Sequence, residues 1–143
     1  MKNQINHMQE AFDLAKIAYD EGEVPVGAVI VDSSGIIIGS GYNMCKKTNN
    51  PTMHAEFIAI SEALFERRYL SDCDLYVTLE PCPMCHGAIE LSRIRRVYFG
   101  AYRDSNSMTS LPDFEIYEGI MREQCSNLLI KFFNEVRKKD FDY

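Results

Sequence analysis

Apolar residues recur along this chain at two spacings, one typical of helices and one typical of buried strands. A spacing of three to four residues predicts helices from Met8 to Tyr19 and from Met121 to Val136. Short apolar, β-branched runs between these helices predict strands over residues 26–31, 36–38, 75–79, 96–102 and, more weakly, 114–117. Strands therefore fill the middle of the chain, and a helix stands at each end.

The segments between these runs predict how the elements connect. A turn from Asp32 to Gly35 joins the first two strands into a β-hairpin. Thr52 is a candidate cap for a helix that carries His54 and continues to about Arg68. Residues 82–92 predict another short helix, which begins with a proline in its first turn.

This alternation of strands and helices predicts an α/β fold, a three-layer sandwich with helices on both faces of a five-stranded sheet. The hairpin makes the sheet mixed. The link from Tyr102 to Phe114 is short for a parallel crossover, which usually takes a dozen or more residues, so the direction of the last strand stays open.

Length and composition predict one soluble domain over residues 1–143 in the cytoplasm. The chain is 46% hydrophobic and 25% charged, has no apolar run of membrane-spanning length, and lacks the apolar core of a signal peptide near Met1. Its five cysteines are an odd number and make a poor disulfide framework. The net charge of -6 argues against nucleic-acid binding through a general positive field, but small basic clusters such as Lys46-Lys47 and residues 137–139 remain.

Two short motifs carry the candidate chemistry: His54-Ala55-Glu56, and the run of residues 81–85 that contains Cys82 and Cys85. His54, Cys82 and Cys85 are three good ligands for one zinc ion per chain. A structural zinc site uses four protein ligands, whereas a catalytic site keeps one position open for water. The two motifs together are the signature of zinc nucleobase deaminases, in which the Glu is the general acid and base and does not bind the metal. Glu56 is the corresponding proton carrier here.

The two motifs also have other interpretations. A lone Cys-x-x-Cys is often a redox pair or half of a structural zinc site. A non-catalytic, zinc-stabilised binding module would need a fourth ligand, such as His7, His86 or another cysteine. His86 directly follows Cys85, and neighbouring residues on a helix point in different directions. A structural site also has no need of Glu56, so a catalytic site is favoured.

The chain resembles the cytidine deaminase-like superfamily and, within it, the bacterial tRNA-specific adenosine deaminases. The resemblance runs from about residue 11 to about residue 139. It is carried by residues 23–28, 41–43, 51–56, 75–85, 92–94, 97–101 and 118–133. It implies a five-stranded sheet between helices, a homodimer, zinc on His54, Cys82 and Cys85, and Glu56 as proton shuttle. The implied reaction converts the wobble adenosine of a tRNA anticodon loop to inosine.

The resemblance also implies two substrate contacts. Asn43 matches an asparagine that contacts the target nucleoside, although a turn residue is the plainer interpretation. Phe133 is a candidate for stacking on a splayed base, and ordinary packing is at least as good an account. The segment from Tyr102 to Asp113 is shorter than in these deaminases and lacks their Gly, His and Lys. A deaminase of a free base or nucleoside, of the guanine or cytosine type, therefore remains an alternative.

Overall fold

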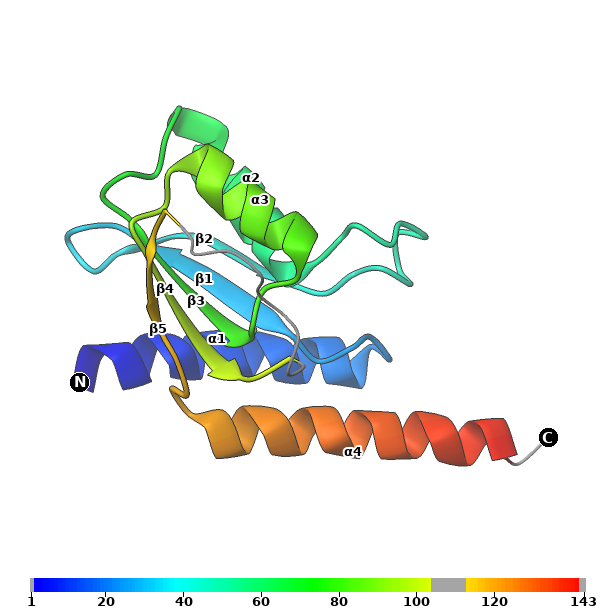
Figure 1. The fold of residues 1–143 in the computed structure, drawn as a ribbon. Coiled ribbons are helices and arrows are strands. Elements are labelled where there is room, and N and C mark those ends of the chain that lie inside the picture. Colours follow the sequence, from blue (N-terminus) through cyan, green and yellow to red (C-terminus); the bar gives the residue numbers. More distant parts are fainter. Residues whose placement is uncertain (1, 104–112, 142–143) are drawn as a thin grey trace.

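Five strands form one mixed sheet that lies between two layers of helices (Figure 1). A computed structural model describes residues 2–103 and 113–141. Helices α1 (Lys2–Asp20) and α4 (Arg122–Phe141) cover one face of the sheet, and α2 (Ala55–Ala63) and α3 (Pro83–Ser92) cover the other. This arrangement confirms the predicted three-layer α/β sandwich.

The sheet has the strand order β2-β1-β3-β4-β5. The strands are β1 (Gly27–Val31), β2 (Ile37–Tyr42), β3 (Asp74–Leu79), β4 (Arg96–Ala101) and β5 (Glu115–Tyr117). Strand β1 is antiparallel to β2 and β3, whereas β3, β4 and β5 run parallel. The direction of the last strand, which the sequence left open, is therefore parallel to its neighbour. Most of the segment that departs from the resembling deaminases, residues 104–112, lies outside the described residues.

The predicted hairpin is confirmed, and one side chain shapes its turn. Asp32 accepts hydrogen bonds through Oδ1 from the backbone amides of Ser34 (2.9 Å) and Ile36 (3.0 Å). An aspartate that bonds amides two and four residues ahead stabilises a tight turn. Strand β1 is buried along its whole length between β2 and β3, as its continuous apolar run predicts.

The predicted start and end of helix α2 were wrong. The helix begins at Ala55, with His54 as its N-cap, and not at Thr52; a short 3-10 helix over Leu64–Glu66 (η1) follows it, and the chain is extended at Arg67. Thr52 lies two positions before the observed N-cap, and its hydroxyl and amide both donate to Asn50 Oδ1, at 2.7 and 2.9 Å. His54 therefore stands just before the first turn.

Close contact between β2 and α2 depends on a glycine. A Cβ atom added at Gly41 would lie 2.7 Å from the carbonyl oxygen of Ala55 and 2.8 Å from Cβ of Ile58. A side chain at this position would therefore push the start of α2 away from the sheet. The glycine allows the two candidate functional residues near that start, His54 and Glu56, to sit against the sheet.

Among residues 2–103 and 113–141, no helix combines the length and the apolar character that crossing a membrane requires.

Candidate active site

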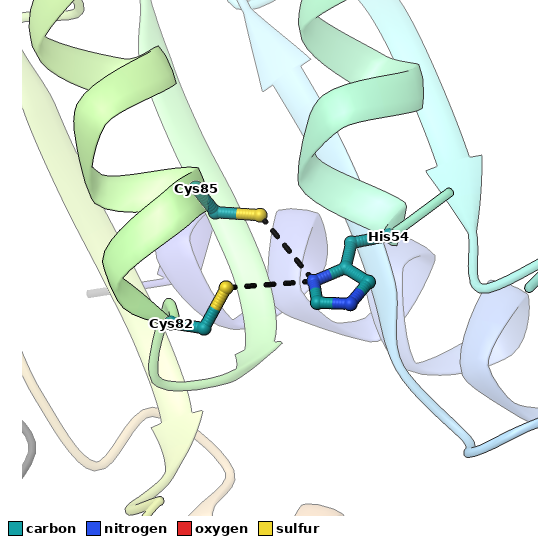
Figure 2. A group of neighbouring side chains, drawn as sticks. All are labelled: His54, Cys82 and Cys85. Carbon is teal, nitrogen blue, oxygen red and sulfur yellow. Dashed lines mark hydrogen bonds between the residues drawn. The ribbon is translucent and has the colours of Figure 1, made fainter. Parts of the chain in front are cut away.

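The three predicted zinc ligands lie together at the starts of two neighbouring helices (Figure 2). His54 is the N-cap of α2, Cys82 is the N-cap of α3, and Cys85 lies in the first turn of α3. The predicted helices, capped by Thr52 and starting at residue 82, would place His54 and Cys82 within the first turns, whereas both are N-cap residues. Pro83 occupies the start of α3, where its missing N–H breaks no helical hydrogen bond.

The distances between these side chains fit a tetrahedral zinc ion. His54 Nδ1 lies 3.5 Å from Cys82 Sγ and 3.6 Å from Cys85 Sγ. Tetrahedral zinc with its usual bond lengths to sulfur and nitrogen would separate such N and S atoms by about 3.5 Å. Elsewhere in the described part of the chain no His, Cys, Asp or Glu joins the group. The three side chains can therefore hold zinc and leave one coordination position for water.

The electrostatic surroundings suit a neutral imidazole at His54 and disfavour the thiolate of Cys85 in the absence of a metal ion. Burial lowers the pKa of His54, and the charge of Arg103 lowers it further. Burial raises the pKa of the Cys85 thiol, and the nearby Glu56 adds to this effect. A thiol in such a place stays protonated without a cation, and a bound metal ion deprotonates it. The site is consequently built for a cation.

Glu56 is buried beside these ligands, in the first turn of α2. Its side chain is only 2% exposed. Burial raises the pKa of its carboxyl group, while hydrogen bonds from its own backbone amide and from Cys85 oppose that shift. A glutamate whose pKa is raised by burial can both take and return a proton near neutral pH. The arrangement therefore places an acid-base group next to the candidate metal centre without making it a ligand.

A cleft of about 520 Å³ opens on this centre, lined by His54, Glu56 and Asn43. Its remaining walls are mostly apolar, and they come from the start of β1, the ends of β3 and β4, and helix α4. Apolar walls with a few convergent polar groups are typical of small-molecule and nucleobase sites. The cleft also lies beyond the carboxyl ends of the parallel strands β3 and β4, where α/β folds usually bind ligands.

The two predicted substrate-contact residues both line this cleft. Asn43 is buried, and its Oδ1 accepts a hydrogen bond from the backbone amide of Ala55 at 2.8 Å. Phe133 is 43% exposed on α4 and meets the ring of Phe132 edge-on, with centroids 5.3 Å apart. Phe132 instead turns toward Tyr19 of α1, 6.4 Å between centroids. The structure therefore brings Asn43 and Phe133 to the cleft, while their roles stay predictions.

The other two histidines lie away from the metal centre. His7 packs on the ring of Tyr76, with centroids 5.1 Å apart, and His86 packs on Phe114 at the same distance. His86 therefore is not a fourth ligand, as its place directly after Cys85 predicts. Cys125 is buried at 1% exposure.

Sequence reasoning missed two charged residues near the cleft. Arg103 lines it, and the Arg103 backbone amide and Nε donate to Glu80 Oε1 (3.1 Å) and to the Glu80 carbonyl (3.2 Å). Glu23 is 2% exposed and accepts two backbone hydrogen bonds from the segment before His54. Their places in the sequence could have indicated both residues. Arg103 comes just after the carboxyl end of β4, and Glu23 comes just before the run that leads into β1.

The fold and the His54, Cys82, Cys85 and Glu56 arrangement define a zinc-dependent hydrolytic deaminase. A family model, the cytidine and deoxycytidylate deaminase zinc-binding region, matches residues 1–101. The chain belongs to this family.

Curated relatives match nearly the whole chain. It is 44% identical over 144 residues to a tRNA-specific adenosine deaminase of Rickettsia bellii, covering 91% of this chain and 99% of that protein. It is 40% identical over 146 residues to a tRNA-specific adenosine deaminase of Bacillus subtilis, covering 93% and 90%. Because each alignment covers at least nine tenths of this chain, the similarity extends from the zinc motifs into the carboxyl-terminal helix.

Solved structures agree with the fold. One, from studies of A-to-I editing by tRNA:A34 deaminases at the wobble position of transfer RNA, superposes with a TM-score of 0.79 at 34% identity, covering 87% of this chain and 99% of that one. A guanine deaminase of Bacillus subtilis is 40% identical but covers only 68% of this chain and 63% of its own, with a TM-score of 0.63.

Proposed function

We propose that this chain hydrolytically deaminates adenosine to inosine at the wobble position of a tRNA anticodon. The observation that carries the proposal is the position of Glu56: its carboxylate is buried beside His54 and Cys85, and both His54 and Glu56 face a cleft large enough for a purine. The relatives named as tRNA-specific adenosine deaminases support the choice of substrate, because they cover at least nine tenths of this chain.

The chain's own residues account for positioning and proton transfer. His54, Cys82 and Cys85 hold the zinc ion, which supplies a Lewis acid that lowers the pKa of a water molecule to about 7. Glu56 takes one proton from the water that attacks C6 of adenine and gives it to ring N1; it then carries the second proton of that water to the amino group, which leaves as ammonia. Water and adenosine thus give inosine and ammonia. The side-chain NH2 of Asn43 is a donor for the nucleoside, because its oxygen already bonds Ala55.

The surface around the cleft offers local contacts for an RNA loop, although the net charge of the chain does not favour RNA binding. The net charge is -6, so affinity has to come from local contacts. Phe133 is an exposed aromatic at the cleft, and stacking on a splayed base contributes about 1–3 kcal/mol. Three exposed basic residues, Arg137, Lys138 and Lys139, follow it near the end of α4 and suit the phosphates of an anticodon loop.

The test compares substrates directly. Purified protein is incubated with an anticodon stem-loop that carries wobble adenosine, and separately with adenosine, guanine and cytosine; inosine and ammonia are then measured. We expect inosine only in the stem-loop, and none in a stem-loop whose wobble base is guanosine. Glu56→Gln is the matched inactive control. Release of ammonia from guanine or cytosine, together with an unmodified stem-loop, would favour the free-base alternative. The partial likeness to the guanine deaminase is the observation that supports this alternative.

We also propose that the protein is a homodimer, as the family resemblance implies. Two large apolar side chains, Phe65 of η1 and Leu91 of α3, are 88% and 83% exposed in the single chain. The segment that follows η1 is tied to the end of α3, because the Leu70 amide bonds the Ser92 carbonyl at 2.8 Å. Sedimentation should give a dimer that Phe65→Lys with Leu91→Lys converts to a folded monomer. A monomeric unchanged protein would contradict the proposal.

The single-domain organisation and the cytoplasmic location of the protein also stay predictions.

A further inference from the structure

Glu23 is a buried carboxylate whose two oxygens are both occupied. Oε1 accepts a hydrogen bond from the backbone amide of Lys46 and Oε2 one from the amide of Lys47, each at 2.9 Å. Its side chain is 2% exposed. Burying a charge is costly unless hydrogen bonds compensate it, and bonds to an ionised group are about twice as strong as neutral ones. Glu23 therefore fixes these two residues firmly in place.

The segment that Glu23 holds is the connection between β2 and α2, residues 44–53, here called the arm. Figure 1 shows the arm projecting beyond the starts of α2 and α3. Its two ends are tied to each other, because the Met44 amide bonds the Met53 carbonyl at 3.0 Å. Beside His54, the Thr52 carbonyl accepts a hydrogen bond from the His54 amide at 2.8 Å, and the Pro51 backbone bonds the His54 side chain. Lys47 also forms a 3.9 Å ion pair with Glu21. Glu23 is the buried side chain that holds the arm at Lys46 and Lys47.

The arm stands at the mouth of the cleft. Cys45 of the arm lines the cleft, and so do the residues on either side of the arm, Asn43 and His54. The side chains of Lys46 and Lys47 are exposed. Lys47 pairs with Glu21, whereas Lys46 makes no ion pair within the part of the chain that the structure describes. In a chain with a net charge of -6, Lys46 is therefore an unpaired cation next in sequence to Cys45, which lines the cleft.

We infer that Glu23 is a positioning residue for substrate selection: it locks the arm so that Lys46 and Lys47 meet the phosphates that flank the target nucleotide in a polynucleotide. The inference deepens the proposed function and rests on it. Phosphate contacts supply most of the affinity of proteins for nucleic acids, and an arm ordered in advance avoids the cost of ordering it on binding. Among the described residues, no hydrogen bond or ion pair joins Glu23 directly to the candidate metal ligands or to Glu56, so we expect its substitution to change binding and not the chemical step.

The test uses Glu23→Gln, with Glu10→Gln, at an exposed position of α1, as the matched control. Gln keeps the shape of the side chain, but its NH2 group cannot accept the second backbone bond. Binding of a fluorescent anticodon stem-loop is measured by anisotropy, and the rate of inosine formation is measured in single turnovers at saturating RNA. We expect Glu23→Gln to raise the Kd about fivefold or more, speed amide exchange in residues 44–53, and leave the saturated rate and the zinc content within about twofold. Glu10→Gln should leave all four unchanged.

The lysines are tested separately by Lys46→Ala with Lys47→Ala. Each lost phosphate contact should reduce the slope of log Kd against log salt by about 1. This double variant leaves Glu23 and its backbone bonds in place, so it decides the matter even if Glu23→Gln does not fold. An unchanged slope would overturn the inference.

Three other outcomes would also overturn it. If amide exchange in the arm rises while the Kd stays the same, the arm does not touch RNA. If zinc content or the saturated rate falls together with affinity, Glu23 supports His54 instead. If the unchanged protein neither binds nor deaminates the stem-loop, both the proposed function and the proposed role of the arm are wrong. Normal activity of the unchanged protein distinguishes the first two outcomes from this third one.

Discussion

The side-chain oxygen of Asn43 accepts a hydrogen bond from the backbone amide of Ala55 at 2.8 Å, across twelve positions of the chain. Ala55 is the first residue of α2 and lies between His54 and Glu56. One side chain thereby satisfies an amide at the start of the helix that carries the acid-base group, and its own NH2 group is left for a ligand in the cleft. Asn43 links the substrate pocket to the placement of Glu56.

Two substitutions at Asn43 should separate these roles. Asn43→Ala leaves the buried Ala55 amide without a partner, which should lower the free energy of unfolding by about 1–3 kcal/mol and lower turnover. Asn43→Asp keeps an acceptor for that amide but has no NH2 donor. We expect it to restore most of the stability while turnover on the stem-loop stays about tenfold low. Thermal unfolding and inosine assays on the same samples measure both, and an Asp variant with full activity would show that the NH2 group does not contact the substrate.

Removal of zinc should stop deamination and leave the fold largely intact. The core is built around the sheet and does not depend on the three ligands. Chelation, or Cys82→Ala, should therefore abolish inosine formation, lower the unfolding midpoint, and preserve the far-ultraviolet circular dichroism spectrum. Metal analysis should give about one zinc per chain before chelation. Complete unfolding of the chelated protein would instead identify the zinc as structural.

Glu56→Gln should separate chemistry from metal binding. A neutral isostere suits a buried position, and the carboxyl pKa there is already raised by burial. Stability and zinc content should therefore be nearly unchanged, whereas the saturated rate should fall by about 10²–10⁴ for loss of a general acid-base group. Glu56→Ala should be at least as inactive. Loss of zinc in the Gln variant would mean that Glu56 is needed to hold the ion.

The zinc motifs and the layer order could be predicted from the sequence because both depend on local patterns. Apolar periodicity gives strands and helices, and Cys82 and Cys85 sit three positions apart, on one face of a short helix. Their meeting with His54 could be expected only because the pair of motifs has a known chemistry.

The remaining features depend on contacts distant in sequence, which no local pattern reveals. Thr52 looks like a helix cap in the sequence. In the structure its hydroxyl donates a hydrogen bond to Asn50 Oδ1, and the oxygen that accepts from the Ala55 amide belongs to Asn43. Glu23 looks like a surface charge until its two backbone partners, 23 and 24 positions away, are known. The direction of β5 likewise required the register Val97 opposite Ile116.

Gly41→Ala should damage the site through packing alone. The added methyl group would lie 2.7 Å from the Ala55 carbonyl oxygen, a backbone atom that cannot move without moving α2. Overpacking of this kind costs about 1–3 kcal/mol. We expect lower stability and weaker zinc retention, because His54 caps the displaced helix. Gly87→Ala is the matched control, since no atom lies within 4 Å of its added Cβ. Equal effects of the two substitutions would rule out a role for close packing at Gly41.

Phe133→Ala should weaken RNA binding with little effect on the fold. The ring is 43% exposed at the cleft, so its removal opens no core cavity, and the neighbouring Phe132 keeps its contact with Tyr19 of α1. If the ring stacks on a base, the loss is about 1–3 kcal/mol, or roughly 5- to 150-fold in the Kd of the stem-loop. Phe133→Trp should retain the affinity, since an indole also offers a stacking face. Ile36→Ala controls for loss of a large exposed apolar side chain elsewhere, because Ile36 is 61% exposed and does not line the cleft. Anisotropy titrations with the same labelled RNA compare the variants, and an Ala variant that binds as tightly as the unchanged protein would assign Phe133 to packing on α4.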